Sequence, residues 1–205
     1  MIKVDIRKKI KVYNGVSSIN VKASFHTGQV TLISGPSGAG KTTFLKILAG
    51  LIKAEEGVIS VDGEVWLDTS QKIFLPTQKR QLGFVFQDYA LFPNMTVLEH
   101  LLFGTKDQDY IKRLLNMGEM LGFQNHKPKH LSGGQMQRLS ILRALSTKPK
   151  VLLMDEPFSA LDQALKISLM TQLKELLSEL GITCLIVSHY QSETEGFAEN
   201  IFNFT

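Results

Sequence analysis

One segment near the N-terminus combines residue types and a spacing that suit phosphate binding. It satisfies the pattern G-x-x-x-x-G-K-[ST] and reads Gly35-Pro36-Ser37-Gly38-Ala39-Gly40-Lys41-Thr42. The glycines allow backbone N–H groups to turn toward a β-phosphate, and a helix that begins near Lys41 directs its positive dipole end at the same anion. We expect Lys41 to reach the β- and γ-phosphates, Thr42 to bind Mg²⁺ and Thr43 to complete the nucleotide ligands. The motif predicts nucleotide binding, and by itself it leaves kinase, GTPase and motor chemistry open.

A pair of carboxylates follows an apolar run farther along the chain. Residues 151–154 are all apolar, and Asp155 and Glu156 come directly after them. A carboxylate at the carboxyl end of a central parallel strand lies beside the phosphate loop in sheets of this kind. We expect Asp155 to hold Mg²⁺ through water and Glu156 to act as general base toward the attacking water. The alternative, two solvated charges at a strand end, is less favourable in a chain that also has the phosphate loop.

The elements that must position these residues follow from the hydrophobic pattern. A β-rich run at 30–34 precedes the phosphate loop, and apolar residues recur at helical spacing from Thr42 to Leu51. The continuous apolar runs at 151–154 and 182–187 are typical of strands buried on both faces of a parallel sheet. Between these two runs, one face of a helix that ends at Gly181 is marked by leucines at helical spacing, namely Leu165, Leu169, Leu173, Leu176 and Leu180. This predicts a βαβ unit.

The remaining segments have different patterns. Residues 2–6 and part of 16–25 alternate, and 57–66 has a hairpin-like setting, so we expect antiparallel strands beside the nucleotide core. Residues from about 90 to 148 lack strand signals and predict an inserted helical lobe.

Composition limits the class of protein. The chain has 205 residues, with 23 Lys plus Arg against 19 Asp plus Glu. The basic residues are scattered, which favours solubility over nucleic-acid binding. The single cysteine, Cys184, lies in an apolar run and is expected to be a small buried side chain in a reducing compartment. The sequence has neither a signal-peptide pattern nor an apolar run of membrane-spanning length, so we expect any membrane role to come through a partner.

A pentapeptide decides the class that these motifs indicate. It reads Leu131-Ser132-Gly133-Gly134-Gln135 and ends sixteen residues before the acidic strand begins. With the phosphate loop and the acidic pair, this arrangement resembles the ATP-binding cassette (ABC) ATPases, over nearly the whole chain. Three further motifs match in order: a glutamine loop at Gln87, a D-loop at residues 159–162 and a switch histidine at His189.

The resemblance implies roles for single residues. Tyr13 lies where the family places an aromatic ring that stacks on adenine, and its alternative is an ordinary surface tyrosine in a turn. Gln87 would offer its amide oxygen to Mg²⁺ and sense the γ-phosphate. The alternative is a solvated loop glutamine without a role in the site. His189 would donate a hydrogen bond to the γ-phosphate and orient Glu156 and the water, although a lone histidine is more often structural. Tyr190 departs from the family, which usually has an acidic residue there.

The pentapeptide also implies a partner. Ser132 can cap a helix, and Gly133 and Gly134 leave backbone amides uncovered at its positive end. In the family this signature, completed by Gln135, closes on the γ-phosphate bound by a second cassette. One cassette per chain therefore implies a two-fold homodimer with two ATP molecules at the seam, where Asp162 would also lie.

The implied fold is α/β: a P-loop NTPase (RecA-like) core with an antiparallel β flank and an inserted helical subdomain. We expect a single ABC ATPase domain at 1–205, with its core at 1–88 and 149–205 and its helical signature lobe at about 89–148. Because the sequence given ends at Thr205, the C-terminal regulatory domain of many importer cassettes is expected to be absent.

The segment from residue 81 to 97 is similar to the importer branch, and residues 66–80 most resemble molybdate-type cassettes, with sulfate, polyamine and sugar importers close behind. The resemblance implies an ATPase that needs ATP and Mg²⁺ and works on membrane permease subunits at the cytoplasmic face of the membrane. An extracytoplasmic substrate-binding protein would act indirectly, and no nucleic acid is expected. In the family a groove beside the glutamine loop receives a coupling helix of the permease, with core packing as the alternative for its residues. Here the groove would include Tyr89, Leu91, Phe92, Met95 and Leu102.

Two other functions stay open on the sequence alone. One is a non-transport ABC ATPase that acts on nucleic acid or ribosomes. The other is a nucleotide-binding switch with little turnover, against which the intact Glu156 and His189 argue.

Overall fold

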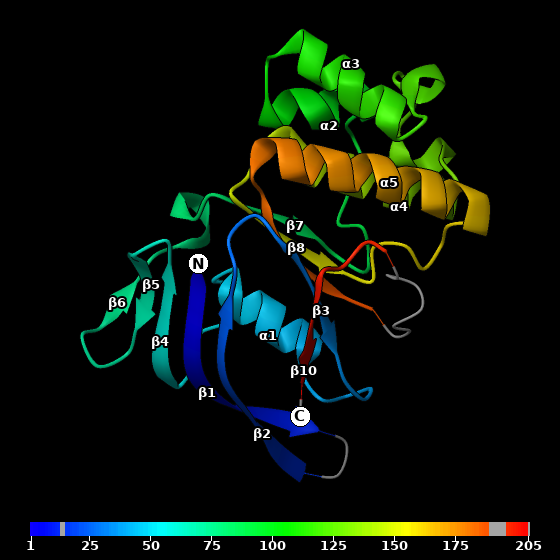
Figure 1. Cartoon of the computed structure of the whole chain (residues 1–205). Coiled ribbons are helices and arrows are strands. Elements are labelled where there is room, and N and C mark those ends of the chain that lie inside the picture. Colours follow the sequence, from blue (N-terminus) through cyan, green and yellow to red (C-terminus); the bar gives the residue numbers. More distant parts are fainter. Residues whose placement is uncertain (13–14, 189–195, 205) are drawn as a thin grey trace.

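The computed structural model describes residues 1–12, 15–188 and 196–204, and it consists of two sheets with helices between and beside them (Figure 1). One sheet is antiparallel, with strand order β2-β1-β4-β5-β6. Its strands are β1 (Ile2–Val12), β2 (Gly15–Phe25), β4 (Glu56–Val61), β5 (Glu64–Asp68) and β6 (Ile73–Phe74). The register of β1 and β2 pairs Ile2 with Phe25 and Ile6 with Val21, which confirms the predicted antiparallel flank.

The second sheet is parallel in every pair and has the order β10-β3-β9-β8-β7. Its strands are β3 (Val30–Ser34), β7 (Leu82–Val85), β8 (Val151–Asp155), β9 (Thr183–Val187) and β10 (Asn200–Asn203). Every residue of β8 and β9 is buried, as the continuous apolar runs predicted. Because all strands run the same way, the segments that follow β3, β9, β8 and β7 meet at one edge of the sheet.

Helix α1 (Lys41–Leu48) lies between the two sheets. Its buried residues Phe44 and Leu48 share a core with Val4 and Ile6 of the antiparallel sheet and with Leu153 of the parallel sheet. The helix ends at Leu48, so Leu51 is outside it and is 48% exposed, contrary to the helical spacing read from the sequence.

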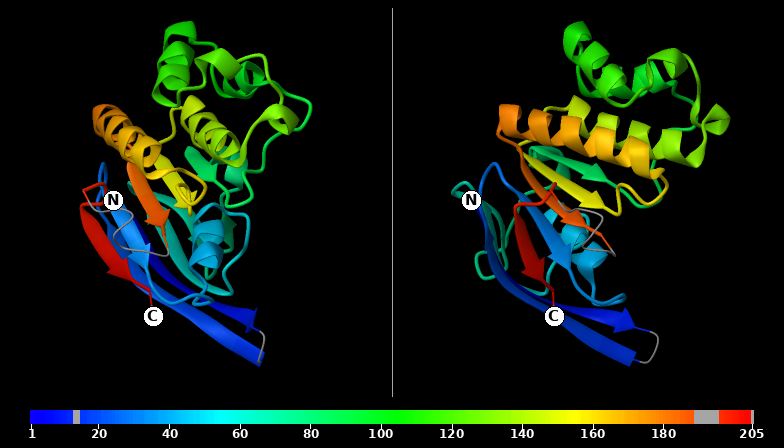
Figure 2. Two further views of the ribbon diagram at one scale, coloured as in Figure 1. Left: turned by 90° about the vertical axis from the view of Figure 1, so that its right-hand side faces the viewer. Right: turned by 45° about the vertical axis from the view of Figure 1, so that its right-hand side comes forward.

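The other four α-helices of the described residues are α2 (Val97–Gly104), α3 (Gln108–Met117), α4 (Gly133–Ser146) and α5 (Gln163–Leu180). On the opposite face of the parallel sheet lie α4 and α5, and α2 and α3 pack against these two helices on the side away from the sheet (Figure 2). Helix α5 connects β8 to β9 and ends at Gly181, whose φ of 64° is the left-handed conformation that glycine adopts without strain. This confirms the predicted βαβ unit, although Leu180 is exposed and Leu177 is buried in its place.

Residues 86–150 are all described and contain no strand, as predicted. Besides α2, α3 and α4 they form two short 3-10 helices, η2 (Leu121–Phe123) and η3 (Pro128–His130), while a further one, η1 (Thr77–Lys79), precedes β7. The exact boundaries of a helical lobe remain a prediction. Within the described ranges, no helix has the length and apolar character needed to cross a membrane.

Candidate nucleotide site

The phosphate loop joins β3 to α1 and leaves the start of that helix open to an anion. Gly40 is the N-cap of α1, with φ of 99°, and it makes no side-chain cap hydrogen bond. The other four α-helices of the described chain each begin with a Thr, Asp or Ser side chain that accepts from the first turn. The first amides of a helix have no intrahelical acceptor, so those of α1 can bind an external anion.

Lys41 lies across this loop. Its side chain is buried, and Nζ donates to the carbonyl oxygens of Gly35 at 2.7 Å and Pro36 at 2.9 Å. Gly35 has to be glycine because a Cβ there would lie 2.4 Å from the carbonyl oxygen of Phe204, which follows β10. Of the other residues here, Ser37 and Gly38 are exposed, and Ala39, Thr42 and Thr43 are half-buried. The loop therefore presents its backbone at the surface, while the side chain of Lys41 is covered.

The acidic pair lies at the same edge, two strands away from the loop. Strand β9 separates β3 from β8, and buried Ser188 follows it. Asp155 is 2% exposed at the end of β8, and Glu156 is half-buried with its backbone N–H donating to the carbonyl of Val187 at 3.0 Å. Glu156 has φ of 52°, an unusual conformation for a residue with a side chain. His189, predicted to lie beside this pair, is outside the described residues, as is Tyr13.

Gln87 follows β7 at the far side of this edge. It is exposed, and three strand spacings of about 4.8 Å place β7 about 14 Å from β3. The two residues at the end of this turn, Tyr89 and Ala90, have φ of 63° and 47°. The guanidinium of Arg143 in α4 donates to the carbonyl oxygens of both, at 3.4 Å for Tyr89. Burial lowers the pKa of Arg143, and the carboxylate of Asp88 acts in the opposite direction.

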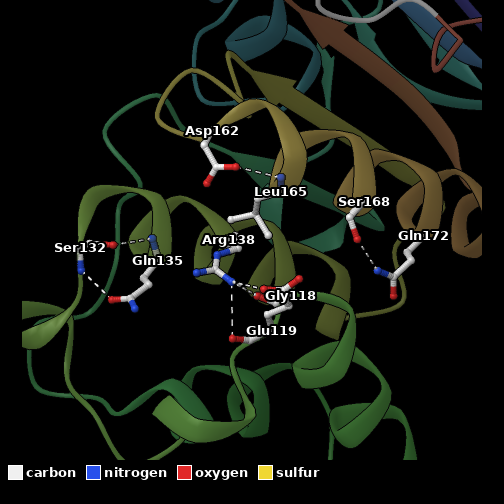
Figure 3. A network of polar contacts seen from close by, with 9 residues as sticks. All are labelled: Gly118, Glu119, Ser132, Gln135, Arg138, Asp162, Leu165, Ser168 and Gln172. Carbon is white, nitrogen blue, oxygen red and sulfur yellow. Dashed lines mark hydrogen bonds and ion pairs between the residues drawn. The ribbon is translucent and has the colours of Figure 1, made fainter.

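The signature segment caps α4 as the sequence predicted. Ser132 Oγ accepts from the N–H of Gln135 at 3.3 Å, and Gln135 Oε1 accepts from the N–H of Ser132 at 2.8 Å (Figure 3). This reciprocal capping box engages both side chains within their own helix. Gly133 and Gly134 contribute only backbone, and a Cβ on Gly134 would lie 3.1 Å from the carbonyl oxygen of Ala160.

Asp162 and Arg138 lie next to this helix start (Figure 3). Asp162 Oδ1 accepts from the N–H of Leu165 at 3.0 Å and thereby caps α5. Arg138 donates to the carbonyl oxygen of Gly118 at 2.6 Å and pairs with Glu119. Burial lowers the pKa of Arg138, whereas the carboxylates of Glu119 and Asp162 act to raise it.

Three polar residues of α4 escaped the sequence analysis: Gln137, Arg138 and Arg143. Gln137 is 1% exposed and lies on the same helical stripe as buried Ile141 and Leu145. A polar residue on an apolar stripe is a signal that the sequence does contain, because such a position is normally apolar unless the polar group finds partners.

The fold and the site together define an ATP-binding cassette. A family model described as ABC transporter matches residues 19–159. The chain belongs to the ABC transporter family, and it has the ABC ATPase cassette fold with the features of the importer type.

Named relatives support the importer type. The molybdenum import ATP-binding protein ModC of Pseudomonas fluorescens is 45% identical over 181 residues, covering 84% of this chain and 49% of the relative. The sulfate/thiosulfate import ATP-binding protein CysA of Bacillus cereus is 42% identical over 186 residues, covering 85% and 50%. The chain therefore spans about half the length of these relatives.

Solved structures agree with the fold. The dimeric structure of MJ0796, a bacterial ABC transporter cassette, is 34% identical with a TM-score of 0.82 and covers 100% of this chain and 94% of its own. A second dimeric structure of MJ0796, in a post-hydrolysis state with ADP and Pi, has a TM-score of 0.84 at the same identity and coverage.

Proposed function

We propose that this chain is the ATP-hydrolysing subunit of an importer, which binds ATP at the phosphate loop and uses hydrolysis to drive uptake through a membrane permease. One observation carries the proposal: the uncapped start of α1, with Lys41 across it, lies at the same sheet edge as Asp155 and Glu156. An anion site and a pair of carboxylates at one edge can bind a triphosphate and activate water against it.

Binding uses groups that the loop already directs outward. The backbone N–H groups of residues 35–43, except at Pro36, which has none, surround the β-phosphate. Lys41 exchanges its two carbonyl partners for β- and γ-phosphate oxygens. The ring of Tyr13 stacks on the base. Thr42, Asp155 and Gln87 offer hydroxyl, carboxylate and amide oxygens, which are the hard donors that Mg²⁺ prefers alongside phosphates and water. These side chains would hold the ion, which would supply neutralisation of phosphate charge.

Hydrolysis requires a base and a positioned water. The Glu156 carboxylate accepts a proton as the water oxygen forms its bond to the γ-phosphorus, and the bond from that phosphorus to the bridging oxygen breaks, leaving the electron pair on ADP. His189 orients the water and the γ-phosphate in this proposal.

A second copy of the chain completes the site. Ser132 of the partner subunit and the amides of the partner subunit's Gly133 and Gly134, with the partner subunit's Gln135, contact the γ-phosphate, and Asp162 lies at the seam. The capping box supports this, because it orients the first turn of α4 without using the glycine amides. The similarity to cassettes solved as dimers supports the same arrangement.

The permease binds beside the glutamine turn at the cytoplasmic face of the membrane. Phe92 is 40% exposed and Leu102 36%, while Tyr89, Leu91 and Met95 are half-buried. Phe103 was not among the residues predicted for this groove, yet it is 70% exposed with its ring 5.6 Å from that of Phe92. An extracytoplasmic binding protein delivers the substrate, for which we propose molybdate or a related anion.

The test compares wild-type protein with Glu156→Gln, and uses Glu175→Gln on the exposed side of α5 as the matched control. We expect Mg²⁺-dependent ATP hydrolysis by the wild type and the control, a rate about 100- to 10,000-fold lower in Glu156→Gln, and an ATP-dependent dimer of Glu156→Gln in light scattering. Hydrolysis by Glu156→Gln at the wild-type rate would refute the role of Glu156, and a monomer at millimolar ATP would refute the shared site.

The substrate needs a separate experiment. Vesicles that contain the permease copurified with this chain should take up molybdate when ATP is supplied on the cassette side. Uptake of sulfate or spermidine without uptake of molybdate would refute molybdate as the substrate and favour the sulfate or polyamine importers among the relatives.

A further inference from the structure

Gln137 lies inside the molecule where the signature helix passes the acidic pair. It belongs to the second turn of α4 and is 1% exposed. Its side chain makes three hydrogen bonds: Nε2 donates to the carbonyl oxygen of Glu156 at 2.9 Å and to Ser159 Oγ at 3.2 Å, and Oε1 accepts from the N–H of Ala160 at 2.7 Å. A carboxamide in which both ends are engaged is held in one orientation, since the Ala160 N–H can only meet the oxygen end.

The contacted backbone is the one that directs the proposed general base. Glu156 is in the left-handed region with φ of 52°, which persists only where the surroundings hold it. Its N–H donates to the carbonyl of Val187 at 3.0 Å, so β9 fixes one side of the residue. Its carbonyl accepts from Gln137 and, at 3.2 Å, from Ser159 Oγ. The direction in which Glu156 points its side chain follows from this backbone conformation.

The same helix begins at the signature. Gly134 lies so close to the D-loop that a Cβ would meet the carbonyl of Ala160 at 3.1 Å, and Gln137 binds the N–H of that same residue. A shift of the signature end of α4 is therefore passed directly to Ala160 and Glu156. Because cores and interfaces transmit such shifts through packed, hydrogen-bonded groups, this contact links two functional segments.

We propose that Gln137 is a positioning residue for hydrolysis, because it holds Glu156 in its strained conformation. Within one subunit, Gln137 also connects two functional segments. One is the signature, which contacts the nucleotide of the partner subunit, and the other is Glu156, the general base for the subunit's own nucleotide. The proposal rests on the function proposed above. It does not make Gln137 a ligand of the nucleotide, since its side chain is used entirely within the chain.

The first test replaces Gln137 by methionine, which has a similar length and lacks hydrogen-bonding ends. Misplacement of a catalytic group by about 1 Å costs roughly 100-fold in rate, so we expect kcat to fall about 10- to 100-fold. The KM for ATP should stay within about twofold, because the phosphate loop is untouched. Ser146→Ala is the matched control: it removes a buried hydroxyl of the same helix that donates to the carbonyl of Arg143 at 2.7 Å, and should leave both constants unchanged.

The second test separates positioning from a general loss of structure. In a Glu156→Gln background, Gln137→Met should cause no further loss of the residual rate, because a residue that acts through Glu156 has nothing left to position. A full additional loss there, or an equal change in KM and kcat, would overturn the proposal. Ser159 is exposed, so its substitution leaves the packing of the core intact. Ser159→Ala removes the other donor to the Glu156 carbonyl and should lower kcat by less than Gln137→Met does.

The two proposals fail in different ways. If the wild type does not hydrolyse ATP, or if Glu156→Gln is fully active, the proposed function is wrong. If the wild type is active, Glu156→Gln has only a strongly reduced rate and Gln137→Met folds with an unchanged kcat, the function stands and the role of Gln137 is refuted.

Discussion

Asp162 is the N-cap of α5, and a pair of substitutions separates its capping hydrogen bond from its charge. The proposed function places it at the seam between two cassettes, whereas within its own chain its Oδ1 accepts from the N–H of Leu165 and caps α5. Asp162→Ala removes both the cap and the charge. Asp162→Asn retains an oxygen that can cap and removes only the charge, so it is the matched control.

The magnitudes follow from the helix start. Loss of an N-cap bond costs about 1 kcal/mol of the free energy of unfolding. Helix α5 has no acidic residue in its first turn, so Asp162 supplies the only carboxylate there, and a charge at this place contributes about 0.3–1 kcal/mol at low salt. We therefore expect Asp162→Ala to lose about 1.3–2 kcal/mol and Asp162→Asn about 0.3–1 kcal/mol. For a chain of this size, 1 kcal/mol shifts Tm by about 2–4 °C.

Urea denaturation at low and at 1 M salt provides the measurement. Asp162 is exposed, so its charge contribution should vanish at 1 M salt, where the Debye length is about 3 Å. The difference between Asp162→Ala and Asp162→Asn should persist, since a hydrogen bond of fixed geometry is not screened in this way. Equal stability of the alanine and asparagine variants would refute the capping argument.

Three further predictions use other contacts of the same structure. Arg143→Met should release the carbonyls of Tyr89 and Ala90 and lower the free energy of unfolding by about 1.5–3 kcal/mol, as is typical for loss of a charged donor. Limited proteolysis should then show more cleavage near residue 90, and cleavage equal to the wild type would contradict the contact. Phe103→Glu should abolish copurification with the permease and leave soluble ATP hydrolysis unchanged, because the ring is exposed beyond the nucleotide site. The pKa of Asp107 lies below its usual range because its carboxylate accepts from Lys148, at 2.9 Å, and from a backbone N–H. A carboxyl with a lowered pKa stabilises the fold above its ordinary pKa, and this stabilisation is lost as the pH falls through the pKa that the group has in the folded state. The free energy of unfolding should therefore fall less steeply with pH below about pH 4 in Asp107→Asn than in the wild type.

The core of the fold could be predicted because its signals are local. Continuous apolar runs marked β8 and β9, alternation marked β1, and Gly181 marked the end of α5. Errors arose at the ends of elements: Leu51 falls beyond α1, and Leu180 faces solvent. Terminal residues carry few packing contacts, so the pattern there is weakly constrained.

The candidate site was predicted where residue type and spacing by themselves define a geometry. The phosphate loop and the Ser132 cap of α4 are of this kind, because hydrogen bonds within a few residues close each of them. The acidic pair was predicted from the apolar run that it follows. The positions of Tyr13 and His189 rest on the family resemblance and lie outside the described residues.

Only the tertiary structure decided how these pieces meet. The strand order inserts β9 between β3 and β8 and sets Gln87 at the far end of the edge. The structure also brings Gln137 to Glu156, 19 positions along the chain, and Arg143 to Ala90, 53 positions away. In each of these long-range contacts the acceptor is a backbone carbonyl, which is chemically the same in every residue. The sequence therefore shows the donor as a polar residue on a helix face that packs inward, but it does not indicate which carbonyl accepts from it. The acceptor is determined by the tertiary fold.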